Sequence, residues 1–595
     1  MRAEYLDTDV LVIGGGAAGC SAALRAHALG AKVLVVVKGK MGRSGATPFA
    51  SAIAGPPPAL LPPALMKPAM AIYAALADRI PLPLPGRYRD AIRQTVEWHH
   101  WLVDQDYFLN FGMWALGTFF PALEAKGLYV LRDKSGMPAT PPGQSLYALH
   151  SHGMTGYQYG EWKRKEVLSA AIPVMEEAAV FRLLQDANGA VTGACALDYK
   201  SGRLHIVRAK ATILATGHTN WLSTRATGTR EMAANGLALA ARTGAELQNL
   251  EIQWFHGSDM AAPESWMRLH HYPNYLHGTD RRVVMSNSAG EEYMRIEDFR
   301  VNMPYTIQVK KLYEQVKAGK ASWDRGSFAD FRRVPRDALQ KYQYHWEFYE
   351  KLGKDMGRDR FESGITWHMS AGGVRANVRT METGVPGLFI AGAVGAHMLG
   401  SLIFATYDGE IAGSHAVRFA RTRALAPANG QDVRAEEERL NALLATAASA
   451  SNAGTAPIEA KRRIREIVWN GMMFQKDARG LERALAELAS VRAELLPNLR
   501  LRTATSRYNT DLTEALDVED MLDVCEMTAR ASLLRQESRG PHFREDFPFT
   551  DNDNWLKWIV VARRNGRVDV RFEPVPQKYV RPPKGRIDYL REPLA

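Results

Sequence analysis

A glycine pattern close to the N-terminus could hold a dinucleotide. Gly14, Gly16 and Gly19 follow an apolar stretch that ends at Ile13, and a helix-like periodic run continues from Ala22. Gly14 permits a tight turn, Gly16 lets a pyrophosphate approach the backbone, and Gly19 lets a helix pack closely on the strand. The unpaired N–H groups at the start of such a helix attract phosphate. The pattern therefore predicts a dinucleotide site along residues 14–19.

The position that normally confirms such a site departs from the expected pattern. A second strand is predicted over residues 32–37 and should end in an acid that binds the ribose hydroxyls, but Val37 stands there, followed by Lys38 and Gly39. A valine offers no hydrogen-bond acceptor in its side chain. A glycine turn in an unrelated α/β protein is the alternative interpretation. The spacing between a strand and a helix favours the dinucleotide.

Bulk composition is that of an ordinary globular protein with several structural units. The chain has 595 residues, of which 46% are hydrophobic and 23% charged. Its net charge of +11 is spread along the sequence, with a mild concentration near the C-terminus. This surface could steer an acidic substrate or an acidic electron-transfer partner, although a solvated face is the plainer interpretation. We expect no nucleic-acid partner.

The cysteine content excludes some kinds of metal site. Cys20, Cys195 and Cys525 are far apart and form no CxxC motif, so the chain cannot ligate an iron–sulfur cluster by itself. We predict no metal site and no disulfide scaffold, which fits a reducing cytoplasm. No secretory segment or membrane-spanning helix is expected.

Several segments can be distinguished along the chain. Residues 55–86 are rich in proline and predict an extended apolar insertion. Residues 179–214 alternate as three strands, with turns at Asn188-Gly189 and Ser201-Gly202. Residues 433–534 have helical periodicity, and strands and loops follow them.

Eight motifs occur in an order that identifies a family. They are the glycine loop, Gly42-Arg43-Ser44-Gly45-Ala46-Thr47, Ile213-Leu-Ala-Thr-Gly217, the segment 244–256 ending in Trp254-Phe-His256, Gly290-Glu-Glu-Tyr-Met294, His368-Met-Ser-Ala-Gly372-Gly373, Val385-Pro-Gly-Leu-Phe-Ile-Ala-Gly392 and Arg535-Gln-Glu-Ser-Arg-Gly-Pro-His542. Together they resemble the flavoprotein family of succinate dehydrogenase, fumarate reductase, L-aspartate oxidase and adenylylsulfate reductase. The resemblance covers nearly the whole chain. The tail at Asn554-Trp-Leu-Lys557 leans toward the adenylylsulfate reductase alpha-subunit-like branch.

The resemblance implies an α/β fold and FAD as cofactor. We expect a Rossmann-like FAD-binding domain with an inserted α+β capping domain, then a helical domain and a short C-terminal region of strands and loops. The expected boundaries are 1–255 and 365–424 for the FAD-binding domain, 256–364 for the cap, 425–535 for the helical domain and 536–595 for the C-terminal region.

The same resemblance, together with the glycine pattern, assigns the cofactor contacts. In the succinate dehydrogenase pattern a histidine attaches FAD covalently, and Gly45 stands at that place, so we predict a non-covalent flavin. Ser401 is expected to cap the helix predicted over 403–417 with its hydroxyl. The predicted contacts are Gly14, Gly16, Ala17, Ala18, Gly19, Lys38, Gly39, Arg43, Ser44, Gly45, Ala46, Thr47, Ala215, Thr216, Gly217, Gly392, Ala393, Ser401 and Leu402.

The substrate residues depart from the family. Dicarboxylate members use one arginine as proton donor and another to clamp a carboxylate; here Tyr305 and Met398 fall at those places. No arginine occurs between Arg379 and Arg418. A carboxylate clamp needs the planar fork of arginine, which methionine cannot supply. Succinate and fumarate are therefore disfavoured as substrates.

Polar and aromatic groups remain at matching positions. His256 and His368 lie in two loops that border the substrate in the family, and either could bind substrate or move a proton. We predict His368, His256 and Tyr305 as catalytic residues, although a single histidine is often structural. His218, Asn220, Trp254, His397 and Arg539 are weaker candidates, and the charges of 535–548 could instead form a salt-bridge network.

Three hypotheses of function follow. The first is an FAD-dependent oxidoreductase that acts on a non-dicarboxylate small molecule and exchanges electrons with an external ferredoxin-type iron–sulfur protein. The second is an electron-transfer subunit that binds FAD without chemistry of its own. The third, a scaffold with a relic flavin site, is disfavoured by the intact glycine loops. The chain could form a homo-oligomer.

Overall fold

The computed structural model describes most of the chain. The described residues are 3–50, 52–54, 89, 92–93, 95–97, 99–125, 148–150, 155–262, 282–294, 304–322, 325–340, 343–397, 401–448, 454–564 and 566–589. The proline-rich segment predicted as an extended insertion, 55–86, lies outside them.

A seven-stranded sheet forms the centre of the fold. Its order is β5-β2-β1-β8-β7-β6, and β15 also pairs with β8. Contacts between β5, β2, β1, β8 and β15 are parallel, whereas β6, β7 and β8 form an antiparallel meander. The α/β prediction and the three-stranded meander are therefore confirmed. The strands are β1 (Ala3–Ile13), β2 (Val33–Val37), β5 (Val174–Glu176), β6 (Ala178–Gln185), β7 (Val191–Asp198), β8 (Arg203–Leu214) and β15 (Leu388–Ile390).

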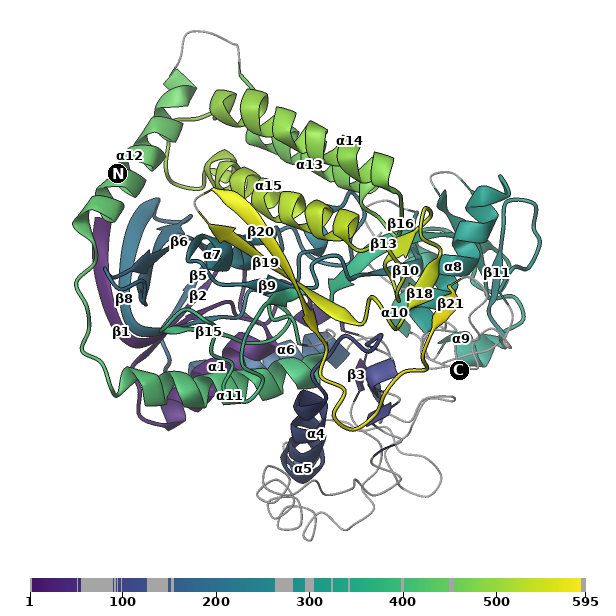
Figure 1. The fold of residues 1–595 in the computed structure, drawn as a ribbon, viewed down its shortest axis with the longest axis horizontal. Coiled ribbons are helices and arrows are strands. Elements are labelled where there is room, and N and C mark those ends of the chain that lie inside the picture. The colour runs from purple at the N-terminus through teal and green to yellow at the C-terminus, as the bar shows by residue number, and fades with distance from the viewer. Residues whose placement is uncertain are drawn as a thin grey trace.

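Two helices cross beneath this sheet in very close contact. α1 (Ala17–Ala28) packs along α11 (Leu402–Ala420), below the strands in Figure 1. A Cβ on Gly409 would stand 2.4 Å from the Ala18 carbonyl oxygen, and one on Gly413 would stand 2.6 Å from that of Ala22. These glycines therefore set the distance between the two helices. The helices α4 (Gln105–Trp114), α5 (Phe120–Ala125), α6 (Thr155–Ser169) and α7 (Asn235–Arg242) complete this part.

A separate four-stranded antiparallel sheet carries the predicted capping region. Its order is β10-β13-β12-β11, and its small core includes Met260, Phe331, Tyr349 and Phe361. Figure 1 shows it at the side of the molecule, away from β1 and β8. Its elements are β10 (Gln253–Met260), β11 (Val284–Ser286), α8 (Pro304–Lys317), β12 (Ser327–Asp330), α9 (Arg336–Gln340), α10 (Gln343–Lys351) and β13 (Arg360–Ser370).

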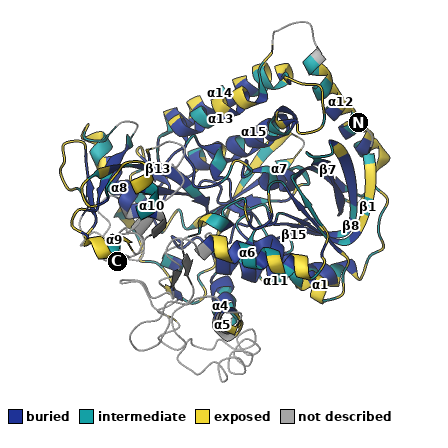
Figure 2. Ribbon diagram, turned by 180° about the vertical axis from the view of Figure 1, so that it is seen from behind, coloured by how far each residue is buried: buried dark blue, intermediate teal, exposed yellow. Residues whose placement is uncertain are grey.

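The predicted helical stretch of 433–534 is confirmed as four long helices. α12 (Gly430–Ala445), α13 (Pro457–Gly471), α14 (Ala478–Ser490) and α15 (Thr510–Leu534) form a layer on the opposite side of the sheet from α1 and α11. Figure 2 shows buried strands between helices whose outer faces are exposed. Among the helices in the described ranges, none combines the length and apolar character needed to cross a bilayer.

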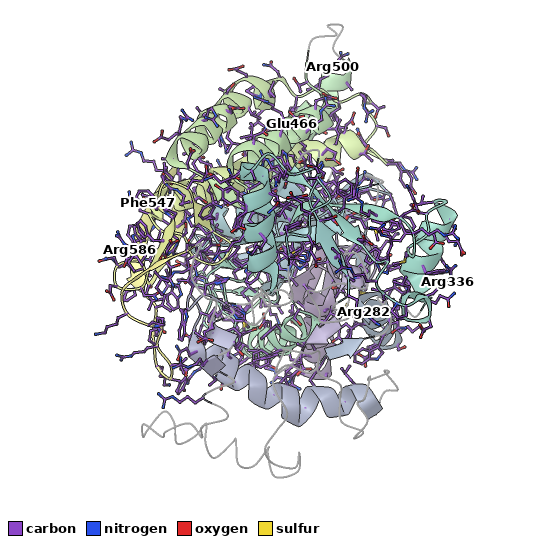
Figure 3. All side chains as sticks on the ribbon, turned by 90° about the vertical axis from the view of Figure 1, so that its right-hand side faces the viewer. Arg282, Arg336, Glu466, Arg500, Phe547 and Arg586 are labelled. Carbon is purple, nitrogen blue, oxygen red and sulfur yellow. The ribbon has the colours of Figure 1, made fainter. Side chains whose placement is uncertain are left out.

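The C-terminal strands return to the body of the molecule. β19 (Lys557–Arg564) pairs with β20 (Arg567–Pro574) and with β9 (Leu247–Gln248), which also pairs with β14 (Gly373–Val374). Figure 3 shows Phe547 and Arg586, from this part of the chain, on the side opposite Arg336 of the cap. The remaining short strands pair as β3 (Ala52–Ala54) with β4 (Ala148–His150), β16 (Gln475–Lys476) with β17 (Phe543–Arg544), and β18 (Phe549–Asp551) with β21 (Arg586–Asp588).

Candidate cofactor and active site

The glycine loop joins β1 to α1 with no room for side chains. Gly14 has φ +118°, and a Cβ there would stand 2.2 Å from the carbonyl oxygen of Ala215. A Cβ on Gly19 would stand 1.9 Å from the carbonyl oxygen of Gly14. Both glycines are therefore required by the protein's own packing, before any cofactor is considered. Ala215 precedes the predicted contacts Thr216 and Gly217, so the two glycine-containing segments meet at this point.

The start of α1 lacks a side-chain cap from its own N-cap residue, Gly16. The backbone N–H of Ala17 donates instead to the Thr47 hydroxyl, 3.1 Å away. This contact brings the predicted flavin loop against the helix N-terminus. Backbone N–H groups at an open helix N-terminus form a suitable site for a pyrophosphate.

The loop at residues 43–47 divides into a surface part and an inner part. The Arg43 guanidinium points outward and forms a two-bonded ion pair with Glu161, at 2.5 and 2.9 Å. Gly45 has φ +77°, and none of the described residues lies within 4 Å of a Cβ placed on it. Its N–H donates to the Thr229 hydroxyl at 2.9 Å. The inner part thus has open space where a ring system could lie against backbone.

Lys38 does not point into an open site. Its ammonium lies 2.5 Å from Asp517 and 2.8 Å from Asn235, which connects the end of β2 to α15. Burial by itself raises the pKa of Asp517, but the charges of Lys38 and Lys461 outweigh it and lower that pKa to about 2. In this structure Lys38 ties the cofactor-binding part to the helical layer. Its predicted cofactor contact remains a prediction.

The prediction that Ser401 caps its helix with its hydroxyl is wrong. Ser401 is the N-cap of α11 with φ −152° and ψ 149°, yet its side chain makes no capping hydrogen bond. Its hydroxyl is buried and has no partner in the described part of the chain. A buried hydroxyl without a partner calls for one, so this oxygen is a candidate contact for a group bound at the start of α11.

A buried aspartate anchors the neighbouring segment. Asp408, on α11, accepts hydrogen bonds from the Gly392 N–H at 3.0 Å and from the Tyr107 hydroxyl at 2.8 Å. His397 Nε2 lies 3.1 Å from the same carboxylate. Asp408 was not identified from the sequence, although its position within an apolar helix is a signal of a buried polar role. Met398, predicted at the place of the clamping arginine, lies outside the described residues.

The two predicted catalytic histidines lie together. The rings of His256, on β10, and His368, on β13, are stacked with centroids 3.6 Å apart and an interplanar angle of 25°. His256 is fully buried, and its Nδ1 lies 3.1 Å from the Asp259 carboxylate. His368 Nδ1 lies 2.8 Å from the Thr227 hydroxyl. The backbone of Tyr305 lies in the first turn of α8, and its side chain is outside the described residues.

Hydrogen bonds connect this histidine pair to the cofactor loops. Asn220 Nδ2 donates to the His368 carbonyl oxygen at 2.9 Å, and the Ser370 N–H donates to His218 Nδ1 at 3.3 Å. His218 directly follows Gly217, and burial lowers its pKa to about 4. Thr227 and Thr229 are close in sequence, so one short segment contacts both His368 and Gly45. The histidine pair is therefore adjacent to the loops predicted to hold the flavin.

Other candidates have structural partners. Arg539 forms hydrogen bonds with Glu537, and Arg535 bridges Glu537 and Glu251. The four side chains are nearly or fully buried. This agrees with the salt-bridge network weighed for this segment. The Trp254 ring packs 5.1 Å from that of His100.

Two polar neighbours of the histidines were missed by sequence reasoning. Asp259 contacts His256, and Thr366 donates to Asp259 and pairs with His256 across the sheet. Their roles depend on how β10 pairs with β13, which no local motif encodes.

These residues fit FAD. The glycine cradle, the helix N-terminus, the space at Gly45 and the unpartnered buried hydroxyl of Ser401 follow one another around the ends of β1, β8 and β15. Ligands of open α/β sheets bind at the carboxyl ends of such strands.

Family comparisons agree with this geometry. A model described as FAD binding domain matches residues 9–402, and one described as fumarate reductase flavoprotein C-term matches residues 461–588. One subunit of the fumarate reductase (CoM/CoB) of Methanothermobacter marburgensis is 26% identical over 579 residues, which cover 95% of this chain and 98% of that protein. L-aspartate oxidase of Streptomyces coelicolor is 25% identical over 583 residues, covering 93% and 91%.

Solved structures share the fold. FrdA of Escherichia coli quinol fumarate reductase matches with a TM-score of 0.81 at 20% identity, covering 96% of this chain and 97% of that one. Adenylylsulfate reductase from Archaeoglobus fulgidus matches with a TM-score of 0.76 at 18% identity, covering 97% of each chain. The FAD-binding model spans well over half of the sequence. The chain therefore belongs to the FAD-binding flavoprotein family of fumarate reductase and succinate dehydrogenase, and it is an FAD-dependent oxidoreductase.

Proposed function

We propose that this flavoprotein exchanges electrons with a small-molecule substrate other than succinate or fumarate, at the face formed by His256 and His368. The observation that carries the proposal is the stacked histidine pair beside the cofactor loops, in which His256 is fully buried and His368 partly buried. The sequence offers Tyr305 and Met398 at the places of the two arginines of dicarboxylate members. A pair of histidines can bind polar groups and move protons, but it lacks the arginine fork for carboxylates.

When bound, FAD supplies hydride or single-electron chemistry. The chain's own residues bind, orient and exchange protons around it. Backbone N–H groups at the start of α1 would hold the pyrophosphate, and Thr229 fixes the loop that carries Gly45. Asn220 and Thr227 fix the position of His368. His256 and His368 are then held where a substrate proton can be taken up or released.

The flavin is held without a covalent bond in this proposal. Gly45 carries no side chain where the succinate dehydrogenase pattern has its attaching histidine, and the space beside it is open. Denaturation in acid should therefore release FAD into the supernatant. Yellow colour that stays with the precipitated chain would refute this part of the proposal.

An external electron carrier completes the reaction. The three cysteines are buried and far apart in the sequence, so the chain does not supply cluster ligands. The methanogen relative is named as a subunit, which supports assembly with another chain. We propose a ferredoxin-type iron–sulfur protein as the partner, in the cytoplasm.

The decisive experiment uses the flavin as its own indicator. The purified holoprotein is photoreduced without oxygen, and a panel of candidate oxidants, including fumarate, is mixed with it while the flavin absorption is followed. We expect rapid reoxidation by a compound other than fumarate. Reoxidation by fumarate at a catalytic rate would refute the proposed specificity.

A second function is favoured by the same missing arginines. Without them the chain could serve as an electron-transfer subunit that binds FAD and performs no substrate chemistry. It would then exchange electrons with a reduced or oxidised ferredoxin and with no small molecule of the panel. The intact histidine pair favours the catalytic interpretation.

A further inference from the structure

A fully buried carboxylate, that of Asp259, lies beside the proposed active site. Asp259 is 0% exposed, and its Oδ1 and Oδ2 lie 3.1 and 3.3 Å from His256 Nδ1. Buried carboxylates are costly unless donors or cations compensate them. A residue of this kind beside a catalytic candidate therefore calls for a physical explanation.

An irregularity in strand pairing brings Asp259 to this position. His256 pairs with Thr366 across the sheet and Asp259 pairs with Gly364, so two residues of β10 stand opposite Ile365 alone. In a regular strand, residues three apart point to opposite faces. Because the bulge inserts one extra residue, the Asp259 side chain lies on the same face of the sheet as His256. The bulge is thus the element that forms the pair.

The donors around Asp259 decide which nitrogen of His256 carries a proton. The Thr366 hydroxyl donates to Asp259 Oδ2. A carboxylate can only accept hydrogen bonds, so the contact with His256 requires the proton on Nδ1. The proton that His256 exchanges with a bound molecule is then the one on Nε2.

The surroundings of His256 and His368 differ in charge, so the two rings are not equally easy to protonate. Two imidazolium rings with centroids 3.6 Å apart would repel strongly, so the stacked pair favours one positive charge at most. Asp259 places its negative charge beside His256, while His368 Nδ1 faces a neutral hydroxyl, that of Thr227. Arg225 also approaches this region, since its guanidinium would stand 2.8 Å from a Cβ on Gly364. The charge pattern favours protonation of His256 over His368.

We propose that Asp259 is a positioning residue that holds the Nδ1 proton of His256 and makes His256 Nε2 the proton donor to the substrate. This rests on the proposed function, in which His256 faces the substrate. During substrate reduction the oxidoreductase reaction supplies the electron pair, the Nε2–H bond breaks, and the new bond forms on the reduced substrate atom. The ring keeps the proton on Nδ1, where it stays hydrogen-bonded to the Asp259 carboxylate. A proton from solvent then restores the Nε2–H bond.

The pair also limits the class of substrate. An aspartate and an imidazolium together carry no net charge, whereas an arginine carries a full positive charge at every relevant pH. The donor therefore suits a substrate whose reacting group is uncharged and gains a proton on reduction. A dicarboxylate would receive less charge compensation at this donor than it does from an arginine.

The protonation of His256 can be measured without a substrate. The holoprotein is labelled with 15N-histidine, and the NMR signals of His256 are assigned by their loss in His256→Gln. In the parent protein we expect a protonated Nδ1. In Asp259→Asn the Thr366 hydroxyl should keep donating to the amide oxygen, so the amide NH2 faces the ring and Nδ1 loses its proton, which leaves a proton on Nε2 only. An unchanged pattern in Asp259→Asn would overturn the proposal.

Two further variants and an activity measurement make the test specific. Asp330→Asn changes another aspartate of the same sheet, one that pairs with Arg332, and should leave the His256 signals as in the parent. Thr366→Val combined with Asp259→Asn removes the orienting hydroxyl and should restore part of the Nδ1–H form. With the substrate found by the panel, Asp259→Asn should lower kcat by about 100-fold or more with KM and FAD content nearly unchanged.

The outcomes separate the two proposals. Unchanged kcat in Asp259→Asn would overturn the role in proton donation. A parent protein that turns over no compound of the panel refutes the proposed function, whereas the NMR pattern still decides whether Asp259 holds the Nδ1 proton.

Discussion

The cofactor cradle and the histidine site are built in different ways. The cradle is made of backbone: Gly14 and Gly19 are required because carbonyl oxygens stand 2.2 and 1.9 Å from any Cβ. The histidine site is made of side chains, and its central contact, His256 to Asp259, depends on a bulge between two strands. A site made of backbone is specified by local glycine spacing. A site made of side chains can change its chemistry while the fold stays the same.

The strongest test of the backbone cradle is Gly19→Ala. A methyl group 1.9 Å from the Gly14 carbonyl oxygen must displace either β1 or α1. We expect loss of bound FAD and a decrease in the free energy of unfolding of about 3 kcal/mol or more. FAD content from the visible absorption and urea denaturation measure the two effects.

Gly384→Ala is the matched control, because a Cβ there meets nothing within 4 Å. It should retain FAD and stability. Retention of full FAD in Gly19→Ala would show that the cradle tolerates side chains, and the contrast between the two sites would no longer hold.

The corresponding test of the side-chain site is His368→Gln. We expect FAD content to be unchanged and turnover of the identified substrate to fall by about 100-fold, within the usual range for loss of an acid–base group. His415→Gln, on the half-exposed side of α11, is the control and should turn over normally. Full activity in His368→Gln would remove His368 from the catalytic site.

The same division explains what the sequence could predict. The glycine loop, the meander between Ala178 and Leu214, and the helices from Gly430 to Leu534 follow from local patterns and agree with the structure. The family resemblance placed both His256 and His368 beside the substrate, but their stacking could not be predicted, because the two lie more than 100 residues apart. Asp259 could not be predicted as a neighbour of His256. Regular strand alternation would place the two side chains on opposite faces of the sheet, and the bulge breaks that alternation.

Side-chain contacts within the cradle were also hard to foresee from the sequence. Lys38 pairs with Asp517 and Asn235, which no local pattern indicated, and its expected cofactor contact stays a prediction. Ser401 was expected to bond the helix backbone, and its hydroxyl makes no such bond. In both cases the residue lies where expected, but its partner depends on tertiary packing.

The Lys38 contact can be tested through its partner. Asp517 has a folded pKa of about 2 against an ordinary value of 3.8, so its stabilisation is present above pH 4 and is lost as the pH falls toward 2. Asp517→Asn should lower the free energy of unfolding by about 2 kcal/mol at pH 7. The difference in the free energy of unfolding between Asp517→Asn and the parent, measured by urea denaturation, should become smaller as the pH falls from 4 to 2.

FAD affinity in the same variant decides the role of Lys38. If Lys38 acts as a tether between β2 and α15, Asp517→Asn weakens stability with FAD affinity nearly unchanged. A gain or loss of FAD affinity of about tenfold, without a change in stability, would instead assign Lys38 to the cofactor.

The smallest expected effect concerns Ser401. A serine that caps a helix loses about 1 kcal/mol on replacement by alanine. Because the Ser401 hydroxyl makes no capping bond, Ser401→Ala should leave the stability of the FAD-free protein within about 0.5 kcal/mol of the parent. Asn429→Ala is the matched comparison, since the Asn429 side chain accepts from the Gln431 N–H at 3.0 Å and caps α12. Asn429→Ala should lose about 1 kcal/mol of stability.

If the Ser401 hydroxyl binds the cofactor, Ser401→Ala weakens FAD binding by about fivefold, the value of one ordinary hydrogen bond. Equal losses of stability in the two variants would show that Ser401 caps its helix after all, and that the cradle has one side-chain contact fewer than proposed.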